Sequence, residues 1–498
     1  METTPPADTT DPAEGLRLGT ARGRWVLAAT ALGSGMAMLD GTVVNVALPR
    51  IGADLDASMA ALQWTVNAYL LTLAGLILLG GSLGDRYGRR RVFLVGVVWF
   101  TAASALCAFA PTAGLLIAAR ALQGVGGALL TPGSLAMLQA SFHPDDRSGA
   151  VGVWSGLGGV GAAAGPFLGG WLVDGPGWRW VFLLNLPLAA AVIAVTARHV
   201  PETRDESASG RFDVPGAVLA ALSLAGLTYA LTEAGRGLSW LFGVAGAALG
   251  VAFVLVERRS PEPMMPLTLF SSRLFSAVNL VTLCVYAAFS GIFLLLMVQL
   301  QTVSGFTPLT AGLALLPITL LMLAYSGRAG RFGHRVGPRL PLVLGPLLCA
   351  GGVLLLLRIG PGASYWRDVL PAVTVLGSGM TLLVAPLTAT VLAAVEVRRA
   401  GIASGVNNAA ARAAGLLAVA ALPPLAGLTG DAYLDPARVD HAFGTAMYAC
   451  AGLLVLGAAL SALTVPRSAL EPEHEAAEPS CAWYCDGSAP PLDRPPSE

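Results

Sequence analysis

Lysine is absent from this 498-residue sequence, and charged residues of any kind are scarce. All 30 basic residues are arginines, Asp and Glu also total 30, and the charged residues together make up only 12% of the chain. Soluble domains carry about 25% charged residues, so this composition excludes an ordinary soluble enzyme. The net charge of zero leaves no basic excess to neutralise phosphates, which argues against a nucleic-acid-binding protein.

Cysteine and the common catalytic patterns are scarce as well. Four of the six cysteines lie singly in apolar segments, where a thiol acts as a small hydrophobe, and Cys481 and Cys485 lie in a polar tail without a nearby histidine to complete a zinc site. The sequence has no metal-spaced histidine cluster, no phosphate-binding Gly-Lys-Ser/Thr sequence and no nucleophile elbow. We therefore expect no metal, no cofactor and no catalysis, and ATP-driven transport is excluded.

Long apolar runs take the place of these missing features. Hydrophobic residues make up 55% of the chain, and a helix that crosses a membrane needs about 20 mostly apolar residues. We find fourteen such runs and predict an all-α integral membrane protein with 14 transmembrane helices. The runs cover residues 25–48, 60–80, 91–110, 113–138, 149–173, 179–197, 214–233, 240–256, 275–300, 308–326, 339–358, 369–394, 401–427 and 443–465.

The arginines separate into two sets when the loops are taken alternately. With the N-terminus inside, 22 of the 30 arginines fall in inner segments, 6 fall in outer segments, and Arg120 and Arg412 lie within spans. Cytoplasmic loops carry the excess of positive charge in membrane proteins. We therefore expect a multi-pass protein of the cell (cytoplasmic) membrane with both termini in the cytoplasm.

One short pattern occurs twice. Residues 81–90, between spans two and three, match residues 330–339, between spans ten and eleven, with His334 in place of Asp85. The match indicates that the last six spans repeat the first six, as parallel repeats of transporters do. The predicted domains are a cytoplasmic tail at 1–24, a six-helix bundle at 25–198, a linker with two inserted transmembrane helices at 199–272, a second six-helix bundle at 273–465 and a disordered cytoplasmic tail at 466–498.

Four segments carry a resemblance to a known family. In chain order they are residues 39–49 (LDGTVVNVALP) in span one, the 81–90 loop, Arg120 with Gln123, Gly124 and Gly126 in span four, and Gly161 with Gly165, Pro166, Gly169 and Gly170 in span five. With these motifs in these spans, the chain over residues 25–465 resembles the fourteen-span drug/proton antiporters of the major facilitator superfamily, of the EmrB/QacA type.

The resemblance implies a proton-coupled multidrug or antibiotic efflux antiporter that exports lipophilic small molecules by alternating access. The proton gradient would drive it without a cofactor, and its partners would be a small lipophilic substrate, protons and the bilayer, with no nucleic acid and with the chain as a monomer. We favour neutral, monocationic or amphipathic aromatic substrates, because Asp40 is the one deep acid. The alternative is a transporter-like sensor or a non-exporting permease for a metabolite, since a shared fold does not fix function.

Two charges within the spans are the candidates for proton coupling. Asp40 lies roughly 14 Å from the outer end of span one and Arg120 roughly 10 Å from that of span four, at 1.5 Å per residue, so the two can meet. Intramembrane charge is costly and indicates function, and a carboxylate that gains or loses a partner changes its proton affinity. A static structural pair is the alternative to a proton-responsive acid.

The loop between spans two and three is the candidate gating motif. Its glycines allow a tight turn, and Asp85 can pair with a neighbouring arginine or with a facing helix N-terminus. Such contacts can form in one transport state and break in the other, whereas a simple positive-inside anchor is the alternative. The motif comprises Gly81, Asp85, Arg86, Gly88, Arg89 and Arg90.

Span five carries small residues at a helical spacing. Gly161, Gly165 and Gly169 recur every four residues, so they lie on one face and allow a second helix to approach closely, while Pro166 removes a backbone hydrogen bond and permits a kink. The resemblance makes Gly161, Gly165, Pro166, Gly169 and Gly170 the antiporter helix motif. Ordinary tight packing is the alternative.

Four further polar residues are candidates for a substrate-binding or gating role: Gln123, Asn407, Asn408 and Arg412. Arg412 lies in mid-span with no acidic residue three or four positions away. It must therefore find its partner on another helix, on backbone carbonyls or on the substrate. A satisfied structural arginine is the alternative for Arg412, and for Gln123 a hydrogen bond between helices is favoured over a ligand contact.

Overall fold

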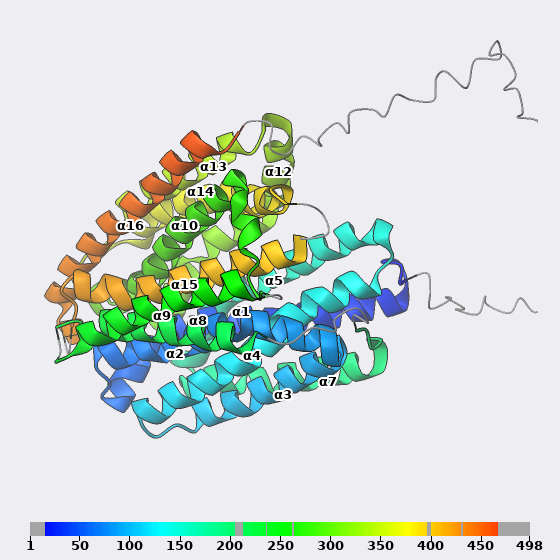
Figure 1. Cartoon of the computed structure of the whole chain (residues 1–498). Coiled ribbons are helices and arrows are strands. Elements are labelled where there is room, and N and C mark those ends of the chain that lie inside the picture. The colour runs from blue at the N-terminus through cyan, green and yellow to red at the C-terminus, as the bar shows by residue number, and fades with distance from the viewer. Residues whose placement is uncertain are drawn as a thin grey trace, which may run out of the picture.

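The computed structural model describes residues 15–204, 213–235, 237–260, 263–395, 400–429 and 432–466, and these parts are almost entirely helical (Figure 1). The first half contains α1 (Ala21–Leu55), α2 (Met59–Tyr87), α3 (Arg89–Ala108), α4 (Ala113–Ser141), α5 (Pro144–Asp174), α6 (Arg179–Leu183) and α7 (Asn185–His199). The pair α8 (Val214–Thr232) and α9 (Ser239–Arg259) follows. The second half contains η1 (Leu267–Ser271), α10 (Arg273–Val298), η2 (Gln299–Val303), α11 (Pro308–Ala314), α12 (Leu316–Val336), α13 (Arg339–Leu356), η3 (Tyr365–Val369), α14 (Leu370–Ala393), α15 (Ala400–Leu425), η5 (Ala432–Leu434) and α16 (Pro436–Thr464).

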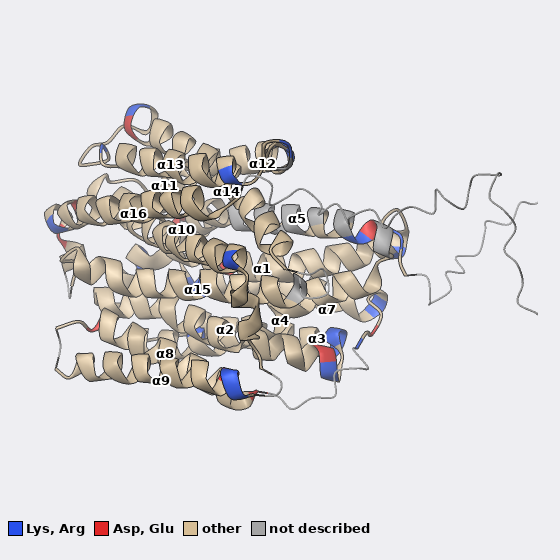
Figure 2. Cartoon of the chain, turned by 45° about the horizontal axis from the view of Figure 1, so that its top comes forward, with Lys and Arg blue, Asp and Glu red and all other residues tan. Residues whose placement is uncertain are grey.

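The all-α membrane fold is confirmed. Thirteen helical segments in the described part of the chain are long and apolar enough to cross a membrane, by length and composition. Helix α5, whose side chains are described only in part, takes the place of the fifth predicted span. Figure 2 shows the charged residues, coloured on the ribbon, mostly at the two ends of the helices, with few between them. The chain thus leaves a central apolar belt, as a lipid environment requires.

Several helices are longer than the predicted spans. Helix α1 has 35 residues and is therefore roughly 52 Å long at 1.5 Å per residue, whereas the hydrocarbon core is about 30 Å thick. The apolar run marks only the part of a helix that crosses this core. The helix itself begins where Thr20 caps it, with Thr20 Oγ1 accepting from Gly23 N at 3.0 Å, so the predicted tail at 1–24 is too long by four residues.

The predicted loop at residues 81–90 was also wrong in its local structure. Helix α2 continues to Tyr87 and α3 begins at Arg89, so the turn consists of Gly88 alone. Gly88 has φ 103°, a conformation that residues with a Cβ rarely adopt. The second copy behaves alike, because α12 continues to Val336 and Gly337 has φ 80°. The motif residues therefore lie on rigid helix ends.

The inserted pair of helices lies along the seam between the two halves. Helices α8 and α9 pack against each other, and α8 also packs against α2 of the first half and α15 of the second. The approach to α2 is close, since a Cβ added to Gly75 would lie 2.8 Å from Ala221 Cβ. Figure 1 shows this green pair beside α2 and α15. The two six-helix bundles with two added helices are as the sequence predicted.

The start of α1 and the end of α16 point to one end of the bundle, which we call the terminal end, and the opposite end is the distal end (Figure 1). The turns at Gly88 and Gly337 lie at the terminal end. The predicted tail at 466–498, with Cys481 and Cys485, lies outside the described residues apart from Pro466.

Candidate functional site

Asp40 and Arg120 meet in the interior of the first half. Arg120 Nη1 donates to Asp40 Oδ2 at 2.5 Å, and the two residues are 0% and 1% exposed. The other carboxylate oxygen, Oδ1, accepts from Gln123 Nε2 at 2.9 Å and from Asn185 Nδ2 at 3.0 Å. The carboxylate therefore has a charged partner and two neutral donors, which is the condition under which a buried charge is tolerated.

The arginine is held equally firmly. Its Nε donates to the Thr65 carbonyl at 3.1 Å and its Nη1 to Gln123 Oε1 at 2.7 Å. Its guanidinium carbon lies 4.3 Å from the centre of the Tyr69 ring, a cation–π contact. Helices α1, α2, α4 and α7 thus all contribute to one polar centre, so any relative movement of these helices acts on the charges.

Sequence reasoning missed three members of this centre. Asn185, on α7, donates to both Asp40 and Ser104 of α3, the latter at 2.9 Å, and Tyr69 lies against the arginine. The available signal was Asn185 itself, an isolated amide in the apolar stretch FLLNLPL of span six. A polar side chain in such a stretch needs a partner on another helix.

Asp85, Arg89 and Arg90 of the arginine-rich motif at the terminal end contact other residues of the first half. Arg89 Nη2 lies 2.7 Å from Asp85 Oδ1, one helical turn away. Arg90 Nη2 donates to the Ala197 carbonyl at 2.6 Å, and Arg90 N donates to Glu202 Oε1 at 3.1 Å. These bonds fix the start of α3 to the end of α7. Asp85 is thus paired with a neighbouring arginine, the first of its two predicted partners, while the side chain of His334 lies outside the described set.

The glycine face of α5 packs against α1. A Cβ added to Gly161 would lie 3.3 Å from Gly35 Cα, one added to Gly165 would overlap Thr42 Oγ1, and one added to Gly169 would lie 3.1 Å from the Val43 carbonyl. A Cβ at Gly165 would require Thr42 to move, and one at Gly161 or Gly169 would crowd the backbone of α1, so the glycines allow α5 to lie close to α1 over these two turns.

The neighbouring row of α5 faces the second half of the chain. A Cβ on Gly170 would lie 2.5 Å from Leu309 Cα, and one on Gly312 of α11 would overlap the Pro166 carbonyl oxygen. Helix α5 therefore contacts α1 through one face and α11 through the next, so it links the helix that carries Asp40 to the second half.

Arg412 lies at the middle of α15, in the second half. It is partly exposed and makes no hydrogen bond or ion pair among the residues that the structure describes. Its guanidinium interacts electrostatically with the hydroxyls of Tyr69 on α2 and Tyr286 on α10. Arg412 is thus near both halves at once, at the level of the Asp40 centre.

The two asparagines beside it have different surroundings. Asn407 Nδ2 donates to Asn279 Oδ1 at 3.1 Å and to Thr282 Oγ1 at 2.8 Å, which ties α15 to α10. Asn408 is exposed, and its Nδ2 donates to the Ser404 carbonyl of its own helix. Asn407 is therefore occupied within the second half, whereas Asn408 leaves its carbonyl oxygen available.

Hydrogen bonds between the halves close the distal end. Gln63 Nε2 donates to the Val419 carbonyl at 2.7 Å, Gln301 Nε2 donates to the Val46 carbonyl at 3.0 Å, and Leu309 N donates to Asp174 Oδ2 at 2.9 Å. The Tyr433 hydroxyl also donates to the Ala57 carbonyl. These bonds occur in the distal parts of α1, α2, α5 and α15, so in this state the two halves are joined there.

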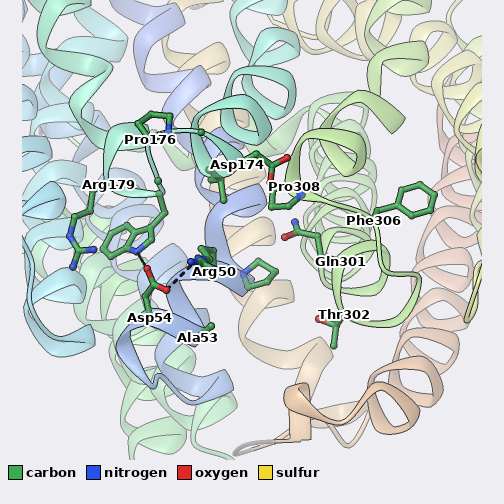
Figure 3. A pocket seen from close by; sticks show the side chains of 15 residues that line it. Arg50, Ala53, Asp54, Asp174, Pro176, Arg179, Gln301, Thr302, Phe306 and Pro308 are labelled. Atoms are coloured by element: carbon green, nitrogen blue, oxygen red, sulfur yellow. Dashed lines mark hydrogen bonds and ion pairs between the residues drawn. The ribbon is translucent and has the colours of Figure 1, made fainter.

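A cavity of about 680 Å³ lies at the same end, outside these bonds, between α1, the α5–α6 turn and the segment before α11 (Figure 3). Asp54 accepts from Trp178 Nε1 at 3.0 Å and lies 3.3 Å from Arg50 Nε. Asp174, Gln301 and Pro308 form the opposite side (Figure 3). The cavity is a polar vestibule and is separate from the Asp40 centre.

Comparison with known proteins places these features in a family. Residues 30–419 match the family model described as the Major Facilitator Superfamily. The chain is 39% identical over 391 residues to the multidrug resistance protein Stp of Mycobacterium tuberculosis, covering 77% of this chain and 72% of that protein. It is 37% identical to the puromycin resistance protein pur8 of Streptomyces alboniger, covering 86% and 88%, and 37% identical to the tetracenomycin C resistance and export protein of Streptomyces glaucescens, covering 85% and 79%.

Solved structures agree on the fold. A crystal structure of the POT family transporter PepTSo superposes with a TM-score of 0.63 at 17% identity, covering 89% of this chain and 97% of that one. A crystal structure of a D-xylose-proton symporter gives a TM-score of 0.62 at 16% identity, covering 89% and 96%. Identities this low support the fold and say nothing about the substrate.

Proposed function

The chain belongs to the major facilitator superfamily, and from this premise we propose that it exports lipophilic small molecules across the cytoplasmic membrane in exchange for protons. Relatives at 37–39% identity are named for multidrug resistance, puromycin resistance, and tetracenomycin C resistance and export. Their names support export of antibiotic-like compounds by this chain. The transport would proceed by alternating access, with the two halves rocking about a site between them.

One observation carries the proton coupling. Helix α1 bears both Asp40, the buried acid of the first half, and Val46, whose carbonyl accepts the Gln301 bond from the second half. The two positions are six residues apart, or about 9 Å along one helix. Opening the distal end requires the Gln301 bond to break, and the resulting movement of α1 acts directly on the contacts of Asp40.

The proposed mechanism follows from the number of hydrogen-bond donors around the carboxylate of Asp40. In the distally closed state the Asp40 carboxylate accepts hydrogen bonds from Arg120, Gln123 and Asn185. When the distal end opens, α1 shifts against α4 and the carboxylate loses donors, so a proton from that side takes their place. Return to the closed state re-forms the pair with Arg120 and expels the proton at the terminal end, which completes one exchange.

We also propose that the terminal end faces the cytoplasm and that the transporter acts as a monomer. The excess of arginine in the segments assigned to the terminal end supports this orientation. Thiol labelling of single cysteines introduced at Arg204 and at Arg358 would test it. An impermeant reagent added to intact cells should label position 358 and spare position 204, and the reverse pattern would invert the direction of transport.

The decisive experiment compares Asp40→Asn with Asp54→Asn in inside-out vesicles. The amide retains the shape of Asp40 but cannot titrate, so export of a fluorescent lipophilic dye under an imposed pH gradient should be lost. Asp54 lies on the same helix but in a partly exposed ion pair, so its variant should transport at a rate close to that of the wild type. Coupled export in a correctly inserted Asp40→Asn protein would remove Asp40 from the mechanism, and an absence of export in the wild type would favour a sensor or a non-exporting permease.

A further inference from the structure

Helices α2 and α15 run antiparallel, and their contacts fix which residues face one another. Gln63 bonds to the carbonyls of Val419 and Ala420 at the distal end. Nearer the terminal end, a Cβ on Gly405 would lie 3.2 Å from Leu78 Cδ2. Gly405, Asn408, Arg412 and Val419 are spaced by three, four and seven residues, so they share one helix face. That face, with Arg412 near its centre, is directed at α2.

The same register places an unpartnered amide one turn from Arg412. Asn67 lies on the face of α2 that carries Gln63, four residues further along, and is 0% exposed. Neither its Oδ1 nor its Nδ2 has a hydrogen-bond partner among the described residues. In this register Asn67 lies opposite the α15 residue that is four positions after Arg412. Along the helix axis, Asn67 and Arg412 are therefore separated by about 6 Å. A buried amide without partners is costly, so the interface between α2 and α15 holds two unpaired polar side chains, Arg412 and Asn67, about one helical turn apart.

The unpaired charge at the interface of α2 and α15 is positive, because it belongs to Arg412. The one acid at this depth in the described spans, Asp40, is 0% exposed and fully used by Arg120, Gln123 and Asn185. Arg412 has no acid to pair with, and the neighbouring hydroxyls of Tyr69 and Tyr286 are neutral. On the bilayer side α8 packs over the seam between α2 and α15. Among the described residues nothing supplies a counter-charge for Arg412, so a bound anion can supply it.

We propose that the region around Arg412, where α15 meets α2 and α10, binds the anionic group of an amphipathic aromatic substrate, such as a carboxylate or sulfonate. Arg412 is the ion partner, and the amides of Asn67 and Asn408 are neutral hydrogen-bonding groups on either side of it. This inference rests on the proposed export function and narrows its substrates towards lipophilic acids. Lipophilic cations are disfavoured, because the arginine repels them in a medium of low dielectric constant.

A matched pair of dyes tests the inference in the full-length protein. The anion 8-anilinonaphthalene-1-sulfonate and the neutral N-phenyl-1-naphthylamine differ only by the sulfonate group. Export of both is measured with inside-out vesicles that carry the wild type, Arg412→Gln, Arg412→Lys, Asn67→Leu, or Arg358→Gln as the matched control at an exposed distal arginine. In the wild type we expect the sulfonate dye to have the lower apparent KM.

Loss of the arginine should remove this preference. In Arg412→Gln the apparent KM for the sulfonate dye should rise about tenfold or more, as expected for a lost charge-assisted hydrogen bond, while the KM for the neutral dye changes less than about twofold. Arg412→Lys should restore part of the preference, and Asn67→Leu should weaken it. The Arg358→Gln control should leave both KM values unchanged.

The other possible outcomes contradict either the inference alone or the inference together with the proposed function. If both dyes are exported but Arg412→Gln affects them equally, Arg412 does not bind the anionic group, and the inference fails while the export function stands. If replacement of chloride by gluconate abolishes the effect of Arg412→Gln, a solvent anion is the partner of Arg412, and the inference also fails. If the wild type exports neither dye, the proposed function and the inference fail together.

Discussion

The two halves of this transporter treat a charge within the spans in opposite ways. In the first half, Asp40 and Arg120 neutralise each other and are bonded to Gln123, Asn185 and Thr65. In the second half, Arg412 lies at a similar depth and has no ion pair among the described residues. A charge with all its partners inside the protein can respond to a proton without a ligand, whereas a charge without partners needs one from outside. We propose that the first half couples the proton and that the second half binds the charge of the substrate.

The largest expected effect concerns the paired charge. Arg120→Gln leaves the carboxylate of Asp40 buried without its ion partner, which typically costs about 3–5 kcal/mol. We expect a large fall in thermal stability in detergent and loss of transport. The double variant Asp40→Asn with Arg120→Gln should recover most of the stability, because no uncompensated charge is left, while it remains inactive. A double variant as unstable as Arg120→Gln would show that packing, rather than charge, holds this centre.

The next effect separates contacts within a half from contacts between halves. A Cβ at Gly312 would overlap the Pro166 backbone across the two halves, whereas a Cβ at Gly165 would overlap the Thr42 side chain within the first half. Overpacking costs about 1–3 kcal/mol. Gly312→Ala should therefore shift the protein away from the distally closed state, measured as faster thiol labelling of a cysteine introduced at Val419, which is 2% exposed at the closed distal end. Gly165→Ala should lower thermal stability with a smaller change in labelling, and equal labelling in both variants would contradict this distinction.

A smaller effect compares the two copies of the turn motif. Asp85 is ion-paired with Arg89 at the end of α2, and histidine takes its place in the second copy. Asp85→Asn should slow dye export severalfold, because the anion that can form a state-dependent contact is lost. His334→Ala should slow it much less at equal membrane insertion. Equal rates in the two variants would reduce both motifs to topological anchors.

The smallest expected effect is the change in protein stability when the unpaired charge of Arg412 is removed. Arg412→Leu removes no ion pair or hydrogen bond within the described structure, so the free energy of unfolding should change by less than about 1 kcal/mol. The measurement is thermal unfolding of Arg412→Leu, compared with thermal unfolding of Arg120→Gln. A loss as large as that of Arg120→Gln would mean that Arg412 has a protein partner in the folded state.

The sequence predicted the features that depend on composition and on the length of apolar runs. Fourteen apolar runs gave the helices, and the depths of Asp40 and Arg120 suggested that the two residues meet, as they do at 2.5 Å. It could not give helix ends, because helices such as α2 continue beyond the apolar core to a glycine with positive φ. Asn185 and Tyr69 were missed, since their roles depend on contacts between helices far apart in the chain. The closed distal end also lay beyond prediction, because one sequence encodes both transport states.

The position of α8 has a consequence for how a lipophilic compound reaches the interior from the bilayer. Between the two halves there are two lateral seams, one between α2 and α15 and one between α5 and α12. Helix α8 packs along the first seam, and in the described part of the chain neither α8 nor α9 packs substantially against α5 or α12. A compound dissolved in one leaflet is thus shielded from the first seam but not from the second. We expect lateral uptake to be one-sided, so bulky residues placed along α12 should slow entry, and equivalent residues on the outer face of α9 should not.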